Sequence, residues 1–209
     1  MHWFVIVAGE IVLMGAWWGV SSRRRDLWHV IPSVLAVLGV TSVFLAPDAQ
    51  PTVSNARALV VGLATGIALF VATRIFVAIA IHWRPFARHV IDAYREAAEE
   101  PFVRSLVLSL LVSVPSEEFF FRGLTQRTFA ETSIGAGGAA VAALVLYVAA
   151  NAPSRSLPII AGAIVGGALW GGLAWWSGAI VAPLACHVAW TGLMLVLPPR
   201  VGTAGPSAG

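Results

Sequence analysis

The chain has 209 residues, of which 58% are hydrophobic and only 11% charged, and its mean hydropathy is +0.84. A soluble domain of this length could not bury so much apolar surface, so the composition predicts an integral membrane protein. All thirteen basic residues are arginines, and they cluster in short segments between apolar runs. This distribution forms no nucleic-acid-binding stripe and is typical of membrane topology signals, in spite of the formal net charge of +3.

Seven apolar runs are long enough to cross a membrane. The first, residues 4–20, has no basic residue ahead of it and is followed directly by Arg23, Arg24 and Arg25. A secretory signal has the opposite order, so we expect a retained span with the N-terminus outside. The other expected spans are residues 30–46, 58–81, a run that begins near Pro101, a run between a glycine-containing loop at 135–138 and Asn151, and residues 157–176 and 179–197.

Residues 82–100 combine charged and apolar side chains at helical spacing. We predict an amphipathic helix at the cytoplasmic interface, and hence an all-α polytopic membrane helix bundle with about seven transmembrane helices and one interfacial helix. The expected organisation is N-terminal helices at 1–101, a core at 102–197 and a disordered tail at 198–209. The arginine-rich loops and the C-terminus are expected on the cytoplasmic side of a bacterial plasma membrane.

Three charged residues lie inside the fourth span, just after Pro115: Glu117, Glu118 and Arg122. Each charge at the centre of a span costs about 2.5–3.5 kcal/mol, so ionisable groups at this depth indicate function. Glu118 and Arg122 are four residues apart with the acid first, which is the favourable order for a salt bridge on a helix. Glu117 would point about 100° away and remain free to meet neighbouring helices. We expect Pro115 to kink this span.

Two further polar pairs share a helix face, because their members are four residues apart: Tyr147 with Asn151, and His187 with Thr191. Hydroxyl and amide groups within spans often bond only to backbone groups, whereas an intramembrane histidine indicates a functional site. The helical rise places Asn151 nearer the cytoplasmic end than Glu117 and His187.

Other polar residues in the spans have simpler interpretations. Glu10 and Arg74 are expected to form a structural salt bridge between the first and third spans. Cys186 beside His187 suggests a thiol protease, but adjacent residues on a helix point about 100° apart, so a small buried cysteine is the better interpretation. The remaining histidines lack metal-ligand spacing.

Three motifs together resemble those of the CPBP family of intramembrane proteases, also called type II CAAX prenyl endopeptidases or the Abi family. They are Glu-Glu-x-x-x-Arg at 117–122, an aromatic-x-x-x-polar element at 147–151 and His-x-x-x-Thr at 187–191. The family pattern is Glu-Glu-x-x-x-Arg, Phe-x-x-x-His and His-x-x-x-Asn. Asn151 therefore replaces the first histidine, and Thr191 replaces the closing asparagine. The resemblance covers about residues 115–197, and the first three spans carry no family signature.

The resemblance implies an intramembrane endopeptidase that hydrolyses a peptide bond of a membrane-anchored protein or peptide. Glu117 would be the general base that activates water, and Glu118 would hold Arg122 and so fix the helix face. His187 and Asn151 would orient the water or donate hydrogen bonds to the oxyanion. The bilayer and the anchored substrate are the expected partners, and no nucleic acid is expected. The residues expected in support are Arg122, Tyr147, Asn151 and Thr191.

The family's mechanism is described either as metal-dependent or as a water activated by glutamate and histidine. A neutral amide oxygen is a poor zinc ligand, so Glu117 and His187 would leave a metal short of its usual three protein ligands. The residues favour chemistry without a metal, and zinc remains the alternative that the resemblance brings.

Two other classes of function stay open at this point. Loss of the family's His and Asn is compatible with a degenerate member that binds a partner without cleaving it. A transporter would use the charged residues as an ion path, but the spans show no internal repeat and no matching pair of broken helices.

Overall fold

The computed structural model describes residues 1–22 and 26–199, apart from the side chains of residues 96–99. These residues form helices joined by short turns, with no strand among them, which confirms the predicted all-α polytopic bundle. Arg23–Arg25 and the part of the predicted tail from residue 200 onward lie outside the described residues.

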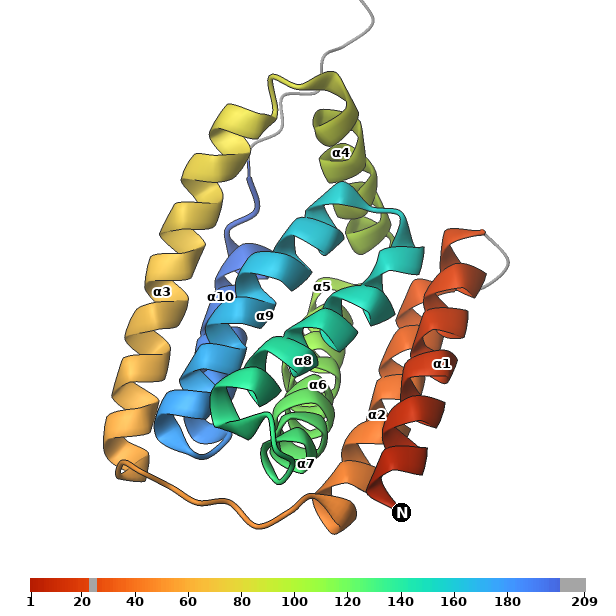
Figure 1. Cartoon of the computed structure of the whole chain (residues 1–209). Helices are drawn as coiled ribbons and strands as arrows, with labels where there is room; N and C mark the ends of the chain where they lie inside the picture. Colours follow the sequence, from red (N-terminus) through yellow and green to blue (C-terminus); the bar gives the residue numbers. More distant parts are fainter. Residues whose placement is uncertain (23–25, 200–209) are drawn as a thin grey trace, which may run out of the picture.

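Six long helices and one composite run follow the predicted spans closely (Figure 1). The predicted glycine loop at 135–138 is wrong, because these residues already form the first turn of a helix and only Gly135 has a positive φ, of 66°. The long helices are α1 (His2–Ser21), α2 (Leu27–Leu45), α3 (Asn55–Ala80), α8 (Gly135–Asn151), α9 (Leu157–Ser177) and α10 (Val181–Val196).

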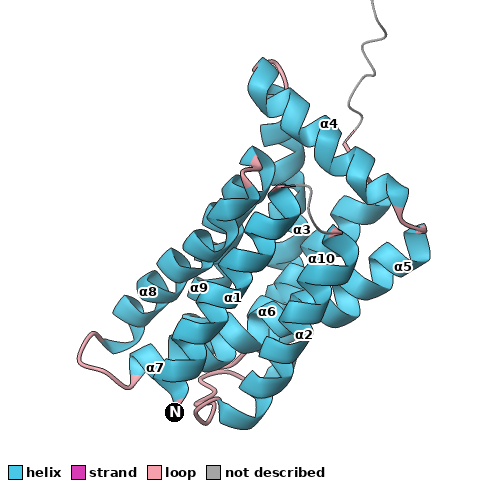
Figure 2. Cartoon of the chain, turned by 90° about the vertical axis from the view of Figure 1, so that its right-hand side faces the viewer, coloured by secondary structure: helices cyan, strands magenta, loops and turns pink. Residues whose placement is uncertain are grey.

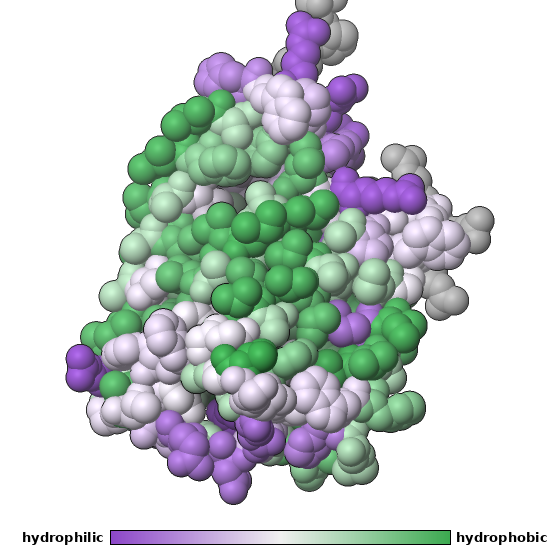
Figure 3. Space-filling model, viewed as in Figure 1, coloured by the Kyte–Doolittle hydropathy of each residue, from purple (hydrophilic) through white to green (hydrophobic). Residues whose placement is uncertain are grey.

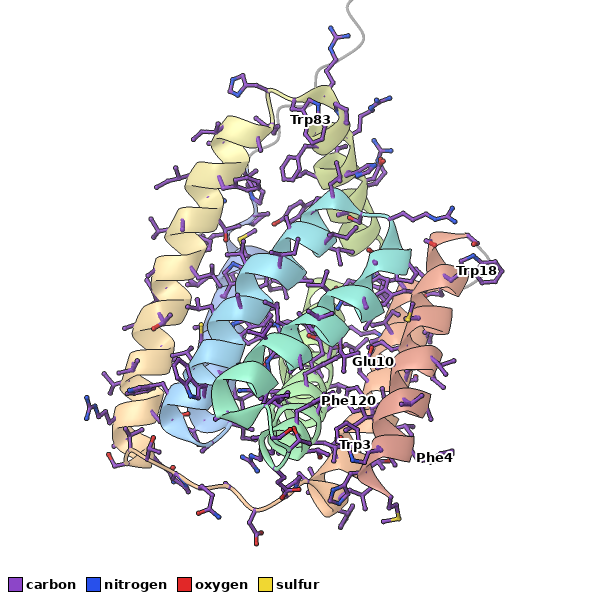
Figure 4. All side chains as sticks on the ribbon, in the orientation of Figure 1. Trp3, Phe4, Glu10, Trp18, Trp83 and Phe120 are labelled. Atoms are coloured by element: carbon purple, nitrogen blue, oxygen red, sulfur yellow. The ribbon has the colours of Figure 1, made fainter. Side chains whose placement is uncertain are left out.

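The outer surface is apolar enough for a bilayer. Five helices in the described residues have the length and hydropathy to cross a membrane: α1, α2, α3, α9, and α8 extended by the 3-10 turn η3 (Ala152–Ser154). The other two predicted spans are α10, with 16 residues, and the composite run. Figure 3 shows a broad hydrophobic band across one face, with hydrophilic residues at its two ends. In Figure 4, Trp3 lies near one end of the bundle and Trp18 and Trp83 near the other, as expected for interfacial aromatic residues.

The composite run corresponds to the fourth predicted span, but its geometry differs from a kinked α-helix. Pro115 has no N–H and its ring crowds the carbonyl four residues earlier, so the preceding segment widens into a π-helix, with Val114 N bonded to Ser109 O. A second π segment begins at Glu118. The run consists of α5 (Phe102–Val107), η1 (Leu108–Ser113), α6 (Val114–Glu117), η2 (Glu118–Gln126) and α7 (Arg127–Ala130).

The predicted amphipathic segment is helix α4 (Arg84–Glu99), which crosses one end of the bundle (Figures 1 and 2). Its apolar face is anchored by Phe86 and Val90, which pack with Val77 of α3 in a small buried cluster. His89 Nδ1 accepts a hydrogen bond of 3.1 Å from Leu157 N, at the first residue of α9. Helix α4 is therefore fixed to both α3 and α9.

The connection between α2 and α3 closes the opposite end. Gln50 N and Thr52 N donate to the carbonyls of Gly178 and Ser177 at the α9–α10 turn. Gly178 has φ of +65°, and a Cβ there would run into the Gln50 backbone, so glycine is required both for the turn and for the close approach. The α9–α10 hairpin is consequently held in place from outside.

Candidate active site

The two glutamates occupy the junction between α6 and the second π segment. Glu117 is the last residue of α6 and Glu118 is the first residue of η2. Helix widening at this junction changes the direction of the side chains that follow, and π segments are frequent at functional sites. The two adjacent carboxylates therefore meet different neighbours, as the sequence predicts.

Glu118 is fully buried and forms the predicted pair with Arg122. The distance from Arg122 Nη1 to Glu118 Oε1 is 3.4 Å, and Arg122 is only 2% exposed. The guanidinium also donates from Nη2 to the carbonyl of Gly167 on α9, at 3.2 Å, and lies over the rings of Tyr147 and Trp170. The ion pair therefore links the composite run to α9 as well as balancing the buried charge.

His187 of α10 lies between the two carboxylates. Its Nδ1 is 2.8 Å from Glu118 Oε1, and its Nε2 is 4.0 Å from Glu117 Oε2. Trp170 of α9 stacks on the imidazole, with ring centroids 3.5 Å apart and planes inclined by 15°. The short contact fits an Nδ1–H donated to Glu118, and this tautomer leaves Nε2 as the atom that faces Glu117. The Glu117–His187 separation is within the reach of one bridging water.

Glu117 is held from the other side by Tyr147 of α8. The Tyr147 hydroxyl donates to Glu117 Oε2 at 2.8 Å. Asn151, one turn further along α8, donates its amide Nδ2 to Tyr147 O at 2.8 Å. Asn151, which the sequence places at a different depth from Glu117, therefore bonds within its own helix. Tyr147 is the member of the 147–151 motif that contacts Glu117.

An apolar cavity of about 580 Å³ opens beside these residues. Five of the seven predicted site residues line the wall of this cavity: Glu117, Tyr147, Asn151, His187 and Thr191. The sixth, Glu118, contacts His187 from behind the wall. Arg122, the seventh, lies behind Glu118. The wall continues along α3, α9 and α10 to the underside of α4, where it includes Phe86, Val90 and Tyr94.

The groups around this cavity do not complete a metal site. Among the described residues there is no group of three or more His, Cys, Asp or Glu side chains placed to hold a metal ion. His187 Nε2 and Glu117 are two candidate ligands, but Asn151 offers only a neutral amide oxygen and Glu118 contacts the other nitrogen of the histidine. This donor set does not match the three protein ligands typical of catalytic zinc.

Two expectations for other polar residues have different outcomes. The predicted salt bridge between Glu10 and Arg74 is wrong. Arg74 Nη1 donates to Leu197 O at 2.6 Å. Both Glu10 carboxylate oxygens are buried without a hydrogen-bond partner among the described residues. Figure 4 shows Glu10 on the side of α1 that faces the bundle. Cys186 is fully buried, as expected for a small core residue.

Trp170 and Gly167 also belong to the site, although the motifs in the sequence did not predict them. A Cβ at Gly167 would lie 2.9 Å from Tyr147 Cδ1, so the glycine makes room for the ring that reaches Glu117. In the sequence, the small residues along this helix indicate close helix packing and not a functional site. The one tryptophan amid these glycines, at 170, is the signal that could have indicated a ring stacked on a group of another helix.

The fold and the site define a polytopic membrane protein with a buried acid–histidine centre at an apolar cavity. A family model described as Type II CAAX prenyl endopeptidase Rce1-like matches residues 99–193. This match confirms the resemblance in the motifs, and the family that the model describes consists of CAAX-type endopeptidases. None of the curated proteins and none of the solved structures that were compared matches the chain.

Proposed function

We propose that this protein is an intramembrane endopeptidase in which Glu117 activates the water that hydrolyses a peptide bond. The observation that carries the proposal is the 4.0 Å separation of Glu117 Oε2 and His187 Nε2 at the wall of an apolar cavity of about 580 Å³. A general base must reach its water within hydrogen-bonding distance, and this spacing allows one water to contact both groups.

The proposed reaction needs only groups that line the cavity. The water oxygen attacks the peptide carbonyl carbon while its proton passes to the Glu117 carboxylate. The carbonyl oxygen becomes an oxyanion, and Thr191 is the polar group of the wall proposed to support it, together with His187, which Glu118 positions. Glu117 then returns the proton to the amine nitrogen as the carbon–nitrogen bond breaks. Arg122 holds the Glu118 carboxylate in place.

We propose that this mechanism requires no zinc, because the side chains at the cavity supply two candidate ligands where a catalytic site has three. The proposed substrate is a membrane-anchored protein or peptide. The wall of the cavity between α3, α4, α9 and α10 is largely apolar, which suits a chain that arrives from the bilayer.

The test is proteolysis by purified Glu117→Gln protein in liposomes, with a farnesylated peptide ending in Cys-aliphatic-aliphatic-X and a library of single-span peptides as substrates. The substitution keeps the shape of the side chain and removes its basicity, so cleavage should fall at least about 100-fold. Glu10→Gln, the same change at a buried glutamate of α1 that does not line the cavity, should keep activity. Full cleavage by Glu117→Gln would contradict the proposal, and inhibition of the native protein by 1,10-phenanthroline would contradict its metal-free form.

A second candidate function is partner binding without cleavage. It is favoured by Asn151 and Thr191, which stand where the family pattern has His and Asn, and by the bond that commits the Asn151 amide to Tyr147 O. A native protein that is inert on both substrate sets, while Asn151→His cleaves them, would support the binder and exclude the native endopeptidase.

A further inference from the structure

The hydroxyl of Tyr147 is the one side-chain donor that bonds to the Glu117 carboxylate in the described part of the chain. The bond, 2.8 Å to Oε2, occupies one lone pair of that oxygen and leaves the other lone pairs of the carboxylate to receive the proton of a water. Because a donor to an ionised acceptor forms one of the stronger kinds of hydrogen bond, it holds the ionised carboxylate in one orientation.

The Tyr147 ring is itself held in place on several sides. Phe121 meets it edge to face with centroids 4.8 Å apart, and the Arg122 guanidinium lies 4.7 Å from its centre. Gly167 leaves the space that the ring occupies, and the side chain is only 5% exposed. A hydroxyl on a ring so confined arrives at Glu117 already oriented, at little further cost in conformational entropy.

Asn151 does not compete for this role. Its amide nitrogen donates to the carbonyl of Tyr147 in the same helix, and no hydrogen bond joins it to Glu117 among the described contacts. The two residues therefore divide the motif: one reaches the acid, and the other stays with the helix backbone.

We propose that Tyr147 is the positioning residue for the general base Glu117, and that its hydroxyl replaces the side chain that a histidine at position 151 would supply. This inference rests on the proposed function and names the group on which the base depends. Tyr147 keeps its proton throughout and acts through Glu117, so it should affect turnover more than substrate binding.

The test is a double-substitution cycle with Tyr147→Phe and Asn151→His, assayed for kcat and KM on the peptide that the native protein cleaves best. Tyr147→Phe removes one oxygen atom and keeps the ring, so we expect kcat to fall about 10- to 100-fold with KM within about threefold of native. Asn151→His alone should change kcat less than about threefold. In the Tyr147→Phe protein, adding Asn151→His should raise kcat at least about tenfold. A purely structural role of Tyr147 would not produce this recovery.

Ser42→Ala is the control for the loss of one buried hydroxyl oxygen, because Ser42 on α2 is fully buried, donates to Leu38 O of its own helix at 2.7 Å and does not line the cavity. The control should keep native kcat. The inference is overturned if Tyr147→Phe keeps kcat within twofold of native, or if Asn151→His gives the same change with and without Tyr147→Phe. An inactive native protein would instead overturn the proposed function.

Discussion

Adjacent glutamates in one helix acquire separate tasks because their surroundings differ. Glu118 has a buried arginine and the histidine as neighbours, whereas Glu117 has a tyrosine hydroxyl and the wall of the cavity. A buried ion pair is costly to break, because removing one partner leaves the other charge without compensation in a medium of low dielectric. Glu118 therefore has a structural role in the buried ion pair with Arg122. Because the pair fixes Glu118, the carboxylate can also hold His187 in position.

Substitution of Glu118 by Ala should lower the free energy of unfolding by about 3–5 kcal/mol, since Arg122 would lose its buried counter-ion. Asp92→Ala is the control, because it removes the acid of the exposed Arg95–Asp92 pair and should cost less than about 1 kcal/mol. Unfolding in detergent, followed by tryptophan fluorescence, measures both variants. Equal losses for the two pairs would contradict the structural role of Glu118.

The sequence could predict the Glu118–Arg122 pair but not the contacts that the site makes with α9. Helical spacing alone brings residues four apart together, so this contact is local information. The bond from Arg122 to Gly167 O and the stacking of Trp170 on His187 depend on how α9 packs against its neighbours. The same limit explains the Glu10–Arg74 error, because opposite charges at similar depth say nothing about which helices are adjacent.

At the scale of whole elements, two features position the site: the π-helical segments of the composite run and the close packing of α3 against α10. The π segments around α6 direct the glutamates, and close packing of α3 against α10 places the segment that carries His187. A Cβ added at Gly66 of α3 would lie 2.5 Å from Cys186 O and 2.9 Å from Ala189 Cβ. Small residues allow such approach of helix backbones in a membrane. The predicted spans locate these helices, but the π geometry follows from a proline whose effect the sequence suggested only as a kink.

Gly66→Ala should therefore push α3 away from α10, lower stability by about 1–3 kcal/mol and reduce cleavage, because Cys186 precedes His187. Gly15→Ala on α1 provides the comparison: a Cβ there meets nothing within 4 Å, and alanine favours the helix by up to about 1 kcal/mol. The same unfolding measurement and peptide assay apply. A Gly66→Ala protein as stable and active as the native one would show that the contact between these helices is adaptable.

For the molecule as a whole, the helical bundle gives the two ends different compositions. Among the arginines that the structure describes outside the spans, Arg84, Arg88, Arg95 and Arg155 lie at the end that carries α4 (Figure 1). At this end, Arg104 of α5 contacts both Glu100, which precedes α5, and His29 of α2. The opposite end holds the N-terminus and the α7–α8 and α9–α10 turns (Figure 1). By the positive-inside rule, we expect the α4 end to face the cytoplasm.

Cysteine labelling in intact cells tests this orientation. Cys186 is buried and is the only cysteine, so Cys186→Ala gives a background without thiols for single substitutions at exposed turns. With the N-terminus outside, Thr132→Cys in the α7–α8 turn should react with a membrane-impermeant maleimide before lysis, and His82→Cys beside α4 only after lysis. The reverse pattern would place α4 outside. It would then follow that the apolar cavity beneath α4 extends from Glu117 toward the external face, so anchored substrates would have to approach from that side.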